Sequence, residues 1–171
     1  MERRSGGDGL MTNLDVFNSV GGEITEASRT ENRDKILRLQ GEMLEMENIV
    51  GECEVKHIFA PGVYAREMTI PKGIVIIGKI HKHRHVNIIS KGSAEVMTEF
   101  GKVHIQAPCT FVSEVGTKRA VLALEDVVWT TIHPTNETDL AKIEDEVIAK
   151  SYDEIVSLGC ADAPKLKGGT L

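Results

Sequence analysis

The sequence lacks the patterns that mark membrane, exported and disulfide-stapled proteins. No apolar run approaches the roughly eighteen residues that a membrane-spanning helix needs. The charged N-terminus has no apolar stretch behind it, so we expect a cytoplasmic protein that is not exported. The three cysteines, Cys53, Cys109 and Cys160, are odd in number and lack C-x-x-C spacing. They fit reduced thiols better than a disulfide framework or a zinc site.

Positive charge and the common catalytic motifs are also scarce. Lys and Arg total 20 against 26 Asp and Glu, a formal net charge of −6. A nucleic-acid partner is therefore not expected, because neutralising a phosphate backbone needs a basic surface. No G-x-S-x-G elbow and no phosphate-binding loop occurs, so the sequence assigns no catalytic residue.

What the chain does contain is a long series of short β-type segments. Its 171 residues suit one domain. Between residues 52 and 134 the apolar runs are short, rich in Val and Ile, and broken by Gly and Pro. Eight or nine strands this closely spaced favour a closed antiparallel barrel over a helical fold. The predicted strands are 55–59, 63–70, 74–81, 86–90, 94–98, 102–106, 110–113, 120–124 and 127–133.

The residues before the barrel predict an arm followed by a helix. Residues 1–27 have too few apolar side chains for a core, and they are either a flexible tail or an arm that orders on a neighbouring subunit. Ser28 and Glu31 fit a capping box, which predicts an amphipathic helix over 28–51. The apolar side chains of this helix form one stripe, which must pack on the barrel or on another subunit. The stripe consists of Ile36, Leu39, Met43, Met46 and Val50.

After the barrel, residues 135–171 predict a helical extension and a tail. Leu140, Ile143 and Val147 form one apolar face, and a second capping-box pattern at Ser151 restarts the helix. The domain therefore has helices on both sides of its strands.

Three histidines stand out within residues 73–92. His81, His83 and His85 alternate along an apolar run, which predicts a single strand with its imidazoles on one side. Such a cluster is typical of a transition-metal site.

The same stretch resembles the first motif of the cupin superfamily, G-x5-H-x-H-x3,4-E-x6-G. Gly73, His81 and Gly92 match it, while Lys79 replaces the first histidine and His85 replaces the glutamate. The second cupin motif, G-x5-P-x-G-x2-H-x3-N, matches only at its central glycine. There Gly116 is kept, and the other positions hold Pro108, Glu114, Arg119 and Ala123.

The resemblance implies a mainly β protein: a single jelly-roll barrel with flanking helices. Barrels of this family commonly associate, so it also implies a homo-oligomer. The segment is similar to uncharacterised cupin-like proteins of bacteriophages and prophages. This implies a phage origin, a place in the host cytosol or the virion, and other virion or host proteins as partners.

Three interpretations of the barrel interior remain open. In the first, His81 and His85, helped by His83, His104 or His133, bind Fe, Mn, Ni or Zn. In the second, the interior is a cationic pocket for a small anion. In the third, the cations pair with Glu67, Glu95 or Glu114, and the barrel is only a scaffold. The pocket residues would be Lys79, His81, His85, Asn87 and Arg119.

Two hypotheses about function follow. The first is a non-enzymatic, homo-oligomeric protein of phage type that serves as a virion component or a binding protein. The sequence favours it because Lys79, His85 and Arg119 replace three cupin ligands, and fixed cations disfavour a metal ion. The second is a metal-dependent oxygenase or isomerase that acts on a small carboxylic acid.

Overall fold

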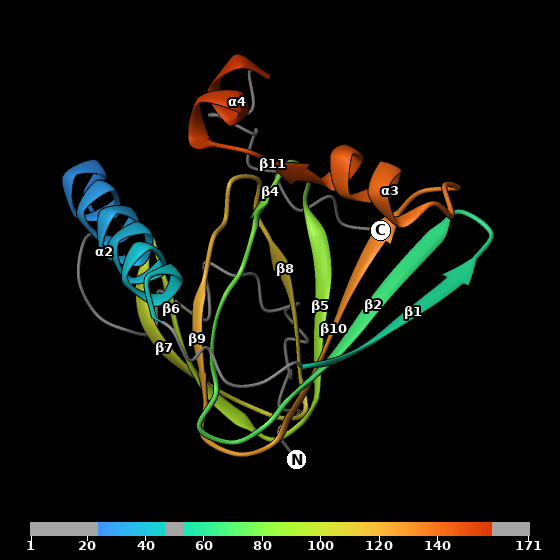
Figure 1. The fold of residues 1–171 in the computed structure, drawn as a ribbon, viewed down its shortest axis with the longest axis horizontal. Helices are drawn as coiled ribbons and strands as arrows, with labels where there is room; N and C mark the ends of the chain where they lie inside the picture. The colour runs from blue at the N-terminus through green and yellow to red at the C-terminus, as the bar shows by residue number, and fades with distance from the viewer. Residues whose placement is uncertain (1–23, 47–52, 159–171) are drawn as a thin grey trace, which may run out of the picture.

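A computed structural model describes residues 24–46 and 53–158 (Figure 1). Most of the predicted arm, Val50 at the end of the predicted helix, and Cys160 in the tail lie outside the described residues. No helix in the described part of the chain is both long and apolar enough to cross a membrane.

The predicted strands are present, with one important break. The predicted strand 74–81 is interrupted at Gly78, and the chain then bends between β4 and β5. His81 and His85 therefore lie on different strands with His83 in the bend, so the prediction of one continuous strand is wrong. The strands are β1 (Glu54–Ala60), β2 (Val63–Ile70), β3 (Val75–Ile77), β4 (Ile80–His81), β5 (His85–Lys91), β6 (Ser93–Thr98), β7 (Gly101–Gln106), β8 (Cys109–Ser113), β9 (Ala120–Ala123), β10 (Val127–Pro134) and β11 (Ile148–Ala149).

The strands form two facing antiparallel sheets and a short ribbon. One sheet has the order β1-β2-β10-β5-β8, the other β3-β9-β6-β7, and β11 pairs with β4. Apolar side chains from both large sheets fill the space between them, including Ile89 and Trp129 from one and Val96 and Val121 from the other. The architecture is the predicted one, a mainly β antiparallel barrel with helices on both sides.

The side chains along strand β10 make one end of the barrel interior apolar and the other end polar. It pairs with β2 on one side and β5 on the other, so that Trp129 lies beside Met68 and Ile89. Because side chains alternate along a strand, Trp129, Thr131 and His133 share one face. That face changes from apolar to polar toward the end of the strand.

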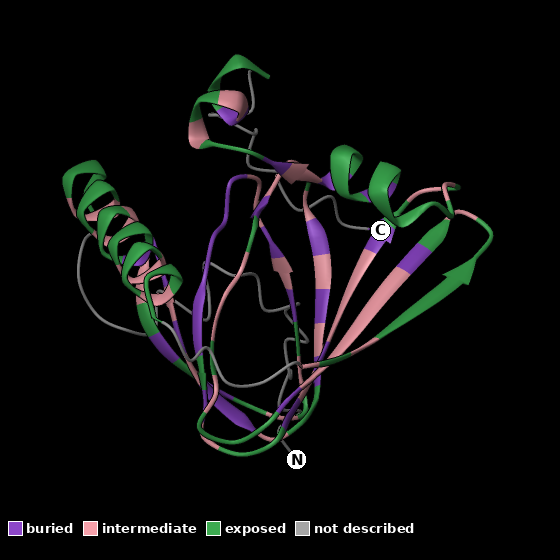
Figure 2. Ribbon diagram, viewed as in Figure 1, coloured by how far each residue is buried: buried purple, intermediate pink, exposed green. Residues whose placement is uncertain are grey.

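Helix α2 (Glu26–Leu44) begins earlier than predicted. Thr25, not Ser28, is the N-cap, and its hydroxyl accepts from the Ser28 backbone N–H at 3.2 Å. Ile36 is the buried residue of this helix, and Leu37 and Leu44 are 42% and 71% exposed. Figure 2 shows a largely exposed helix at the side of the barrel.

Charge holds α2 to the barrel. Glu99, which is 3% exposed, accepts hydrogen bonds from Arg29 at 3.1 Å and from Arg33, and its backbone carbonyl accepts from Asn32. The sequence pattern emphasised an apolar stripe and missed this buried carboxylate.

The C-terminal extension is two short helices separated by a strand. Asp139 caps α3 (Leu140–Val147) by accepting from two backbone N–H groups, and α4 (Tyr152–Ser157) follows β11 with Ser151 as its N-cap. Ile143 and Val147 are buried against Tyr64. In Figure 1, α3 and β11 lie across the upper end of the barrel, where β10 ends and β5 begins.

Two glycines of the first motif give a matched pair for a stability test. Gly92 and Gly73 have φ of +81° and +82°, so alanine is strained by about 1–2 kcal/mol at either position. A Cβ at Gly92 would also lie 2.2 Å from the Asp126 carbonyl oxygen, whereas at Gly73 nothing lies within 4 Å. We expect Gly92→Ala to lower the free energy of unfolding in urea clearly more than Gly73→Ala. Equal decreases in the free energy of unfolding for the two variants would contradict the close approach of Gly92 to the Asp126 carbonyl oxygen.

Candidate metal centre and cavity

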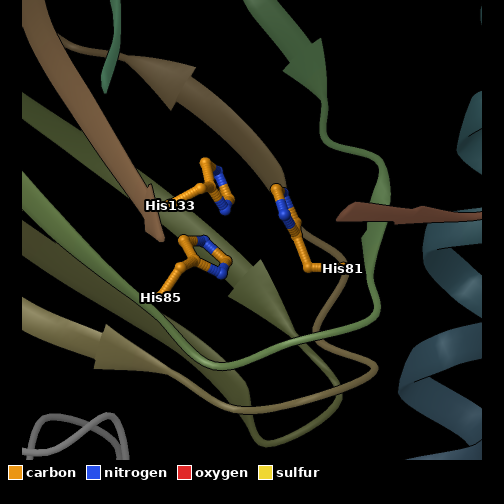
Figure 3. A group of neighbouring side chains, drawn as sticks. All are labelled: His81, His85 and His133. Carbon is orange, nitrogen blue, oxygen red and sulfur yellow. The ribbon is translucent and has the colours of Figure 1, made fainter. Parts of the chain in front are cut away.

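Three histidines from three strands meet at the upper end of the barrel (Figure 3). His81 ends β4, His85 begins β5, and His133 lies near the end of β10. The pairing of β10 with β5 sets His133 near His85, and the bend before β5 turns His81 toward both. Residues far apart in sequence are thus joined in one cluster.

The cluster is compact and enclosed. Ring centroids lie 4.1 Å apart for His81 and His85, 4.8 Å for His85 and His133, and 5.3 Å for His81 and His133. One ring nitrogen from each lies within 4.8 Å of the others. His85 and His133 are each 3% exposed. Three nitrogens this close are the donors that divalent Fe, Ni or Zn accepts.

All three imidazoles are held in their neutral form. Burial is the main cause, and the neighbouring histidines and arginines add to it. The pKa of His81 is lowered to about 2, that of His85 to about 3 and that of His133 to about 4. Metal ions bind neutral imidazole, so these side chains need lose no proton at neutral pH to become ligands.

Two ring nitrogens point to a missing partner. His81 Nδ1 and His85 Nε2 are buried without a hydrogen-bond partner. His85 Nδ1 lies 3.2 Å from the His83 carbonyl oxygen, which can only accept, so Nδ1 carries the proton and Nε2 presents its lone pair. This hydrogen bond orients the ring as outer partners of metal-binding histidines do. A metal ion would satisfy both orphan nitrogens.

A buried hydrogen-bonded chain runs beside the cluster from Trp129 to Arg119. The Trp129 indole donates to Asn87 Oδ1 at 3.0 Å, Asn87 Nδ2 donates to Ser113 Oγ at 2.6 Å, and Arg119 also donates to Ser113 Oγ. Ser113 lies opposite His85 in the pairing of β5 with β8. The chain therefore fixes the guanidinium close to the histidines.

Arg119 has no acidic partner. It is 6% exposed, its Nε is unsatisfied, and no carboxylate oxygen of the described residues lies within 4.0 Å of it. It lies 5.6 Å from the Phe111 ring and 5.9 Å from the Trp129 ring. Burial lowers its pKa to about 10, so it stays charged at neutral pH. An unpaired buried cation is costly, and an anionic ligand would offset that cost.

The cluster and Arg119 line one cavity of about 750 Å³. This volume suits a small organic ligand. Helix α3 contributes Leu140, Ile143, Glu144 and Val147 to the wall, so the C-terminal extension forms part of the site.

The predicted pocket residues separate into an inner group and one rim residue. His81, His85, Asn87 and Arg119 all line the cavity, as does Lys79. Lys79, however, is 58% exposed and pairs with Glu144 of α3. It is therefore a rim residue, because the bend that brings His81 inward leaves Lys79 outside.

His83 and His104, two of the suggested helpers in metal binding, are exposed and lie outside the cluster. The third member is His133, which the strand pattern named only as one of three alternatives. Alternation along 127–133 puts His133 on the same face as Trp129, a signal that favours an inward position.

The acids suggested as partners for the pocket cations pair elsewhere. Glu67 contacts Lys56, Glu95 contacts Lys102, and Glu114 contacts Arg84. The scaffold interpretation assumed that these acids neutralise the interior, and the structure places them on the outer surface instead.

The three lowered pKa values predict acid sensitivity in protein freed of metal by a chelator. In the unfolded chain the histidine pKa lies near 6.5, so between pH 6.5 and 4 the unfolded state binds protons that the folded state excludes. The free energy of unfolding should fall as pH falls, by up to about 1.4 kcal/mol per pH unit and histidine. His85→Gln should reduce this slope in urea titrations. A slope equal to that of the unchanged protein would contradict the burial of a neutral His85.

Comparison with known proteins gives similarity in fold alone. No protein-family model and no curated protein matches the sequence. Among solved structures, KdgF from Halomonas sp. is 20% identical over 53% of this chain and 87% of its own, with a TM-score of 0.43. Ectoine synthase from P. lautus is 13% identical over 62% and 81%, with a TM-score of 0.47. A cupin superfamily protein from Desulfitobacterium hafniense is 9% identical over 55% and 87%, with a TM-score of 0.45. The described part of the chain is itself a mainly antiparallel β fold with helices before and after the barrel.

Proposed function

We propose that this protein is a metal-dependent enzyme of cupin type, an isomerase or an oxygenase, that acts on a small carboxylic acid. The carrying observation is the enclosed cluster of three neutral imidazoles, two of them with an unsatisfied nitrogen, in the wall of a cavity. The cluster supports this function over the scaffold hypothesis, since buried nitrogens without a hydrogen-bond partner cost stability unless a ligand uses them.

The residues fit a divalent Fe, Mn, Ni or Zn ion held by His81, His85 and His133. Three neutral donors leave coordination positions for a substrate, as in catalytic zinc sites with three protein ligands. None of the three ligands is a carboxylate, so the cluster itself does not offset the positive charge of the ion. A carboxylate substrate would supply that negative charge.

When bound, the metal would act as a Lewis acid that polarises an oxygen of the substrate. Arg119 would orient the substrate carboxylate through its guanidinium, which Ser113 holds in place. The apolar wall would exclude bulk water and so strengthen both interactions. That wall includes Met68, Ile76, Val121 and Ile143.

A hydrogen-bonded pair connects the cavity with solvent. The Tyr64 hydroxyl lies 2.7 Å from Nδ1 of the exposed His57, and the buried Tyr64 ring is stacked 6.2 Å from that of His133. Burial raises the pKa of Tyr64, so its hydroxyl keeps its proton at neutral pH. The pair can pass a proton between the cavity and the surface.

Metal binding tests the proposal directly. The purified, chelator-treated protein should take up about one Fe²⁺, Mn²⁺, Ni²⁺ or Zn²⁺ per chain in equilibrium dialysis with elemental analysis. His85→Ala and His133→Ala should each weaken binding at least about 100-fold, since each removes one of three ligands.

His83→Ala and His104→Ala are the matched controls, because both remove exposed imidazoles outside the cluster. They should bind metal as the unchanged protein does. Absence of metal uptake would refute the proposal, and dependence on His83 in place of His133 would refute the ligand set.

A second candidate is a homo-oligomeric scaffold of phage type, as a virion component or a partner of host proteins. It is supported by apolar side chains that the described part of the chain leaves exposed. On β1, Ile58 and Phe59 are 49% and 42% exposed; at the end of α2, Leu44 is 71% exposed, and Met46, just beyond the helix, is 58% exposed. Exposed apolar groups of this kind often mark contacts between subunits.

Mass in solution tests the scaffold role. Light scattering after size exclusion should give a multiple of the 18.7 kDa chain, and Phe59→Glu should lower that multiple if β1 is the contact. Thr110→Glu, on the exposed part of β8, is the control. A monomer at all concentrations would contradict this candidate without affecting the metal site.

A further inference from the structure

A second arginine, Arg66 on β2, lines the same cavity. In the pairing of β2 with β10, Arg66 lies opposite Thr131, and Thr131 lies opposite Asn87 on β5. These three residues form a polar row across the inner face, next to the row that holds His133 and His85. Arg66 is therefore directed into the interior by the same alternation that directs the histidines.

Arg66 also lacks an acidic partner. No carboxylate oxygen of the described residues lies within 4.0 Å of its guanidinium. Glu67, the next residue along the chain, pairs with Lys56, and Glu144, which lines the cavity from α3, pairs with Lys79. Arg66 is half-buried, so water relieves its charge only in part.

The two arginines flank the histidine cluster. Arg119 is anchored at Ser113 on β8, and Arg66 lies on β2, with β10 and β5 between them. Three strand spacings separate β2 and β8, roughly 14 Å along the sheet, and inward side chains shorten that gap. In accord with this placement, the arginines add to the lowering of the histidine pKa values that burial mainly causes: Arg119 acts on His85, Arg66 on His133, and both on His81.

Beside this polar row, the rest of the cavity wall is mainly apolar. Met68 and Trp129 belong to the same sheet, and Ile76 and Val121 belong to the facing sheet. Met68, Ile76, Val121 and Trp129 all line the cavity, and Glu144 at the rim is its single lining carboxylate among the described residues. A ligand that matches this surface has a short apolar body and a negative charge at each end.

We propose that the natural ligand is a small dianion, an organic acid with two carboxylates, whose inner group pairs with Arg119 and whose outer group pairs with Arg66. This inference rests on the proposed function only in taking the cavity as the substrate site. It adds a specificity determinant, Arg66, that separates dicarboxylic from monocarboxylic acids. Bidentate pairing with a carboxylate is the geometry that guanidinium groups favour.

The test measures anion binding to the full-length, metal-free protein by isothermal titration calorimetry. The probes are succinate, glutarate and adipate, each against the monocarboxylate of equal chain length: butyrate, valerate and hexanoate. At least one dicarboxylate should bind tenfold or more tightly than its partner. Arg66→Gln should remove that advantage and leave monocarboxylate affinity within twofold.

Arg84→Gln is the matched control, because Arg84 pairs with Glu114 at 2.9 Å and does not line the cavity. It should leave both affinities unchanged. Arg119→Lys should weaken both probe classes, and if that buried change prevents folding, Arg66→Gln still decides the question.

Two outcomes would overturn the proposal: no dicarboxylate preference in the unchanged protein, or a preference that survives Arg66→Gln. The metal proposal fails separately. A protein that binds no metal but keeps an Arg66-dependent preference would refute the metal-dependent function and support the dianion site. A protein that binds metal but shows no dicarboxylate preference would support the metal-dependent function and refute the dianion site.

Discussion

The hydrogen-bonded pairing of β10 with β2 and β5 is the interaction on which the rest of the structure depends. It joins the last strand of the barrel to two strands made about forty to sixty residues earlier, and so it sets which side chains become neighbours inside. Since side chains alternate along each strand, a slip of one residue would turn Trp129 and His133 outward together. The apolar core and the histidine cluster therefore share one determinant.

The two ends of the barrel interior differ in the side chains that are buried there, and burial affects each kind differently. At the lower end Ile70, Ile89 and Val127 are almost fully buried, and their removal from water stabilises the barrel. At the upper end the same enclosure acts on imidazoles and a guanidinium, where it keeps the histidines neutral and leaves a charge without a partner. A polar interior of this kind costs stability, which is usual where a fold holds a ligand.

The helices before and after the barrel play different parts. Helix α2 is bound to the barrel through the buried carboxylate of Glu99 and the buried side chain of Ile36, while Leu37 and Leu44 stay exposed. Helix α3 instead closes the cavity wall, and its Glu144 draws Lys79 to the rim. That ion pair removes one of the two cations that, from the sequence, weighed against a metal ion.

The sequence by itself determined most of the strands, the presence of helices before and after them, and two of the three clustered histidines; it did not show the break at Gly78 or the short strand β11. Gly and Pro breaks and apolar alternation are local signals, and they need no knowledge of distant neighbours. The same local signals placed His83 with His81 and His85, because a strand pattern does not show a bend. Only the tertiary structure decided that His133 completes the cluster, that Lys79 leaves it, and that Arg66 and Arg119 line the same cavity. Each of these depends on strand pairing between residues dozens of positions apart, which no local pattern contains.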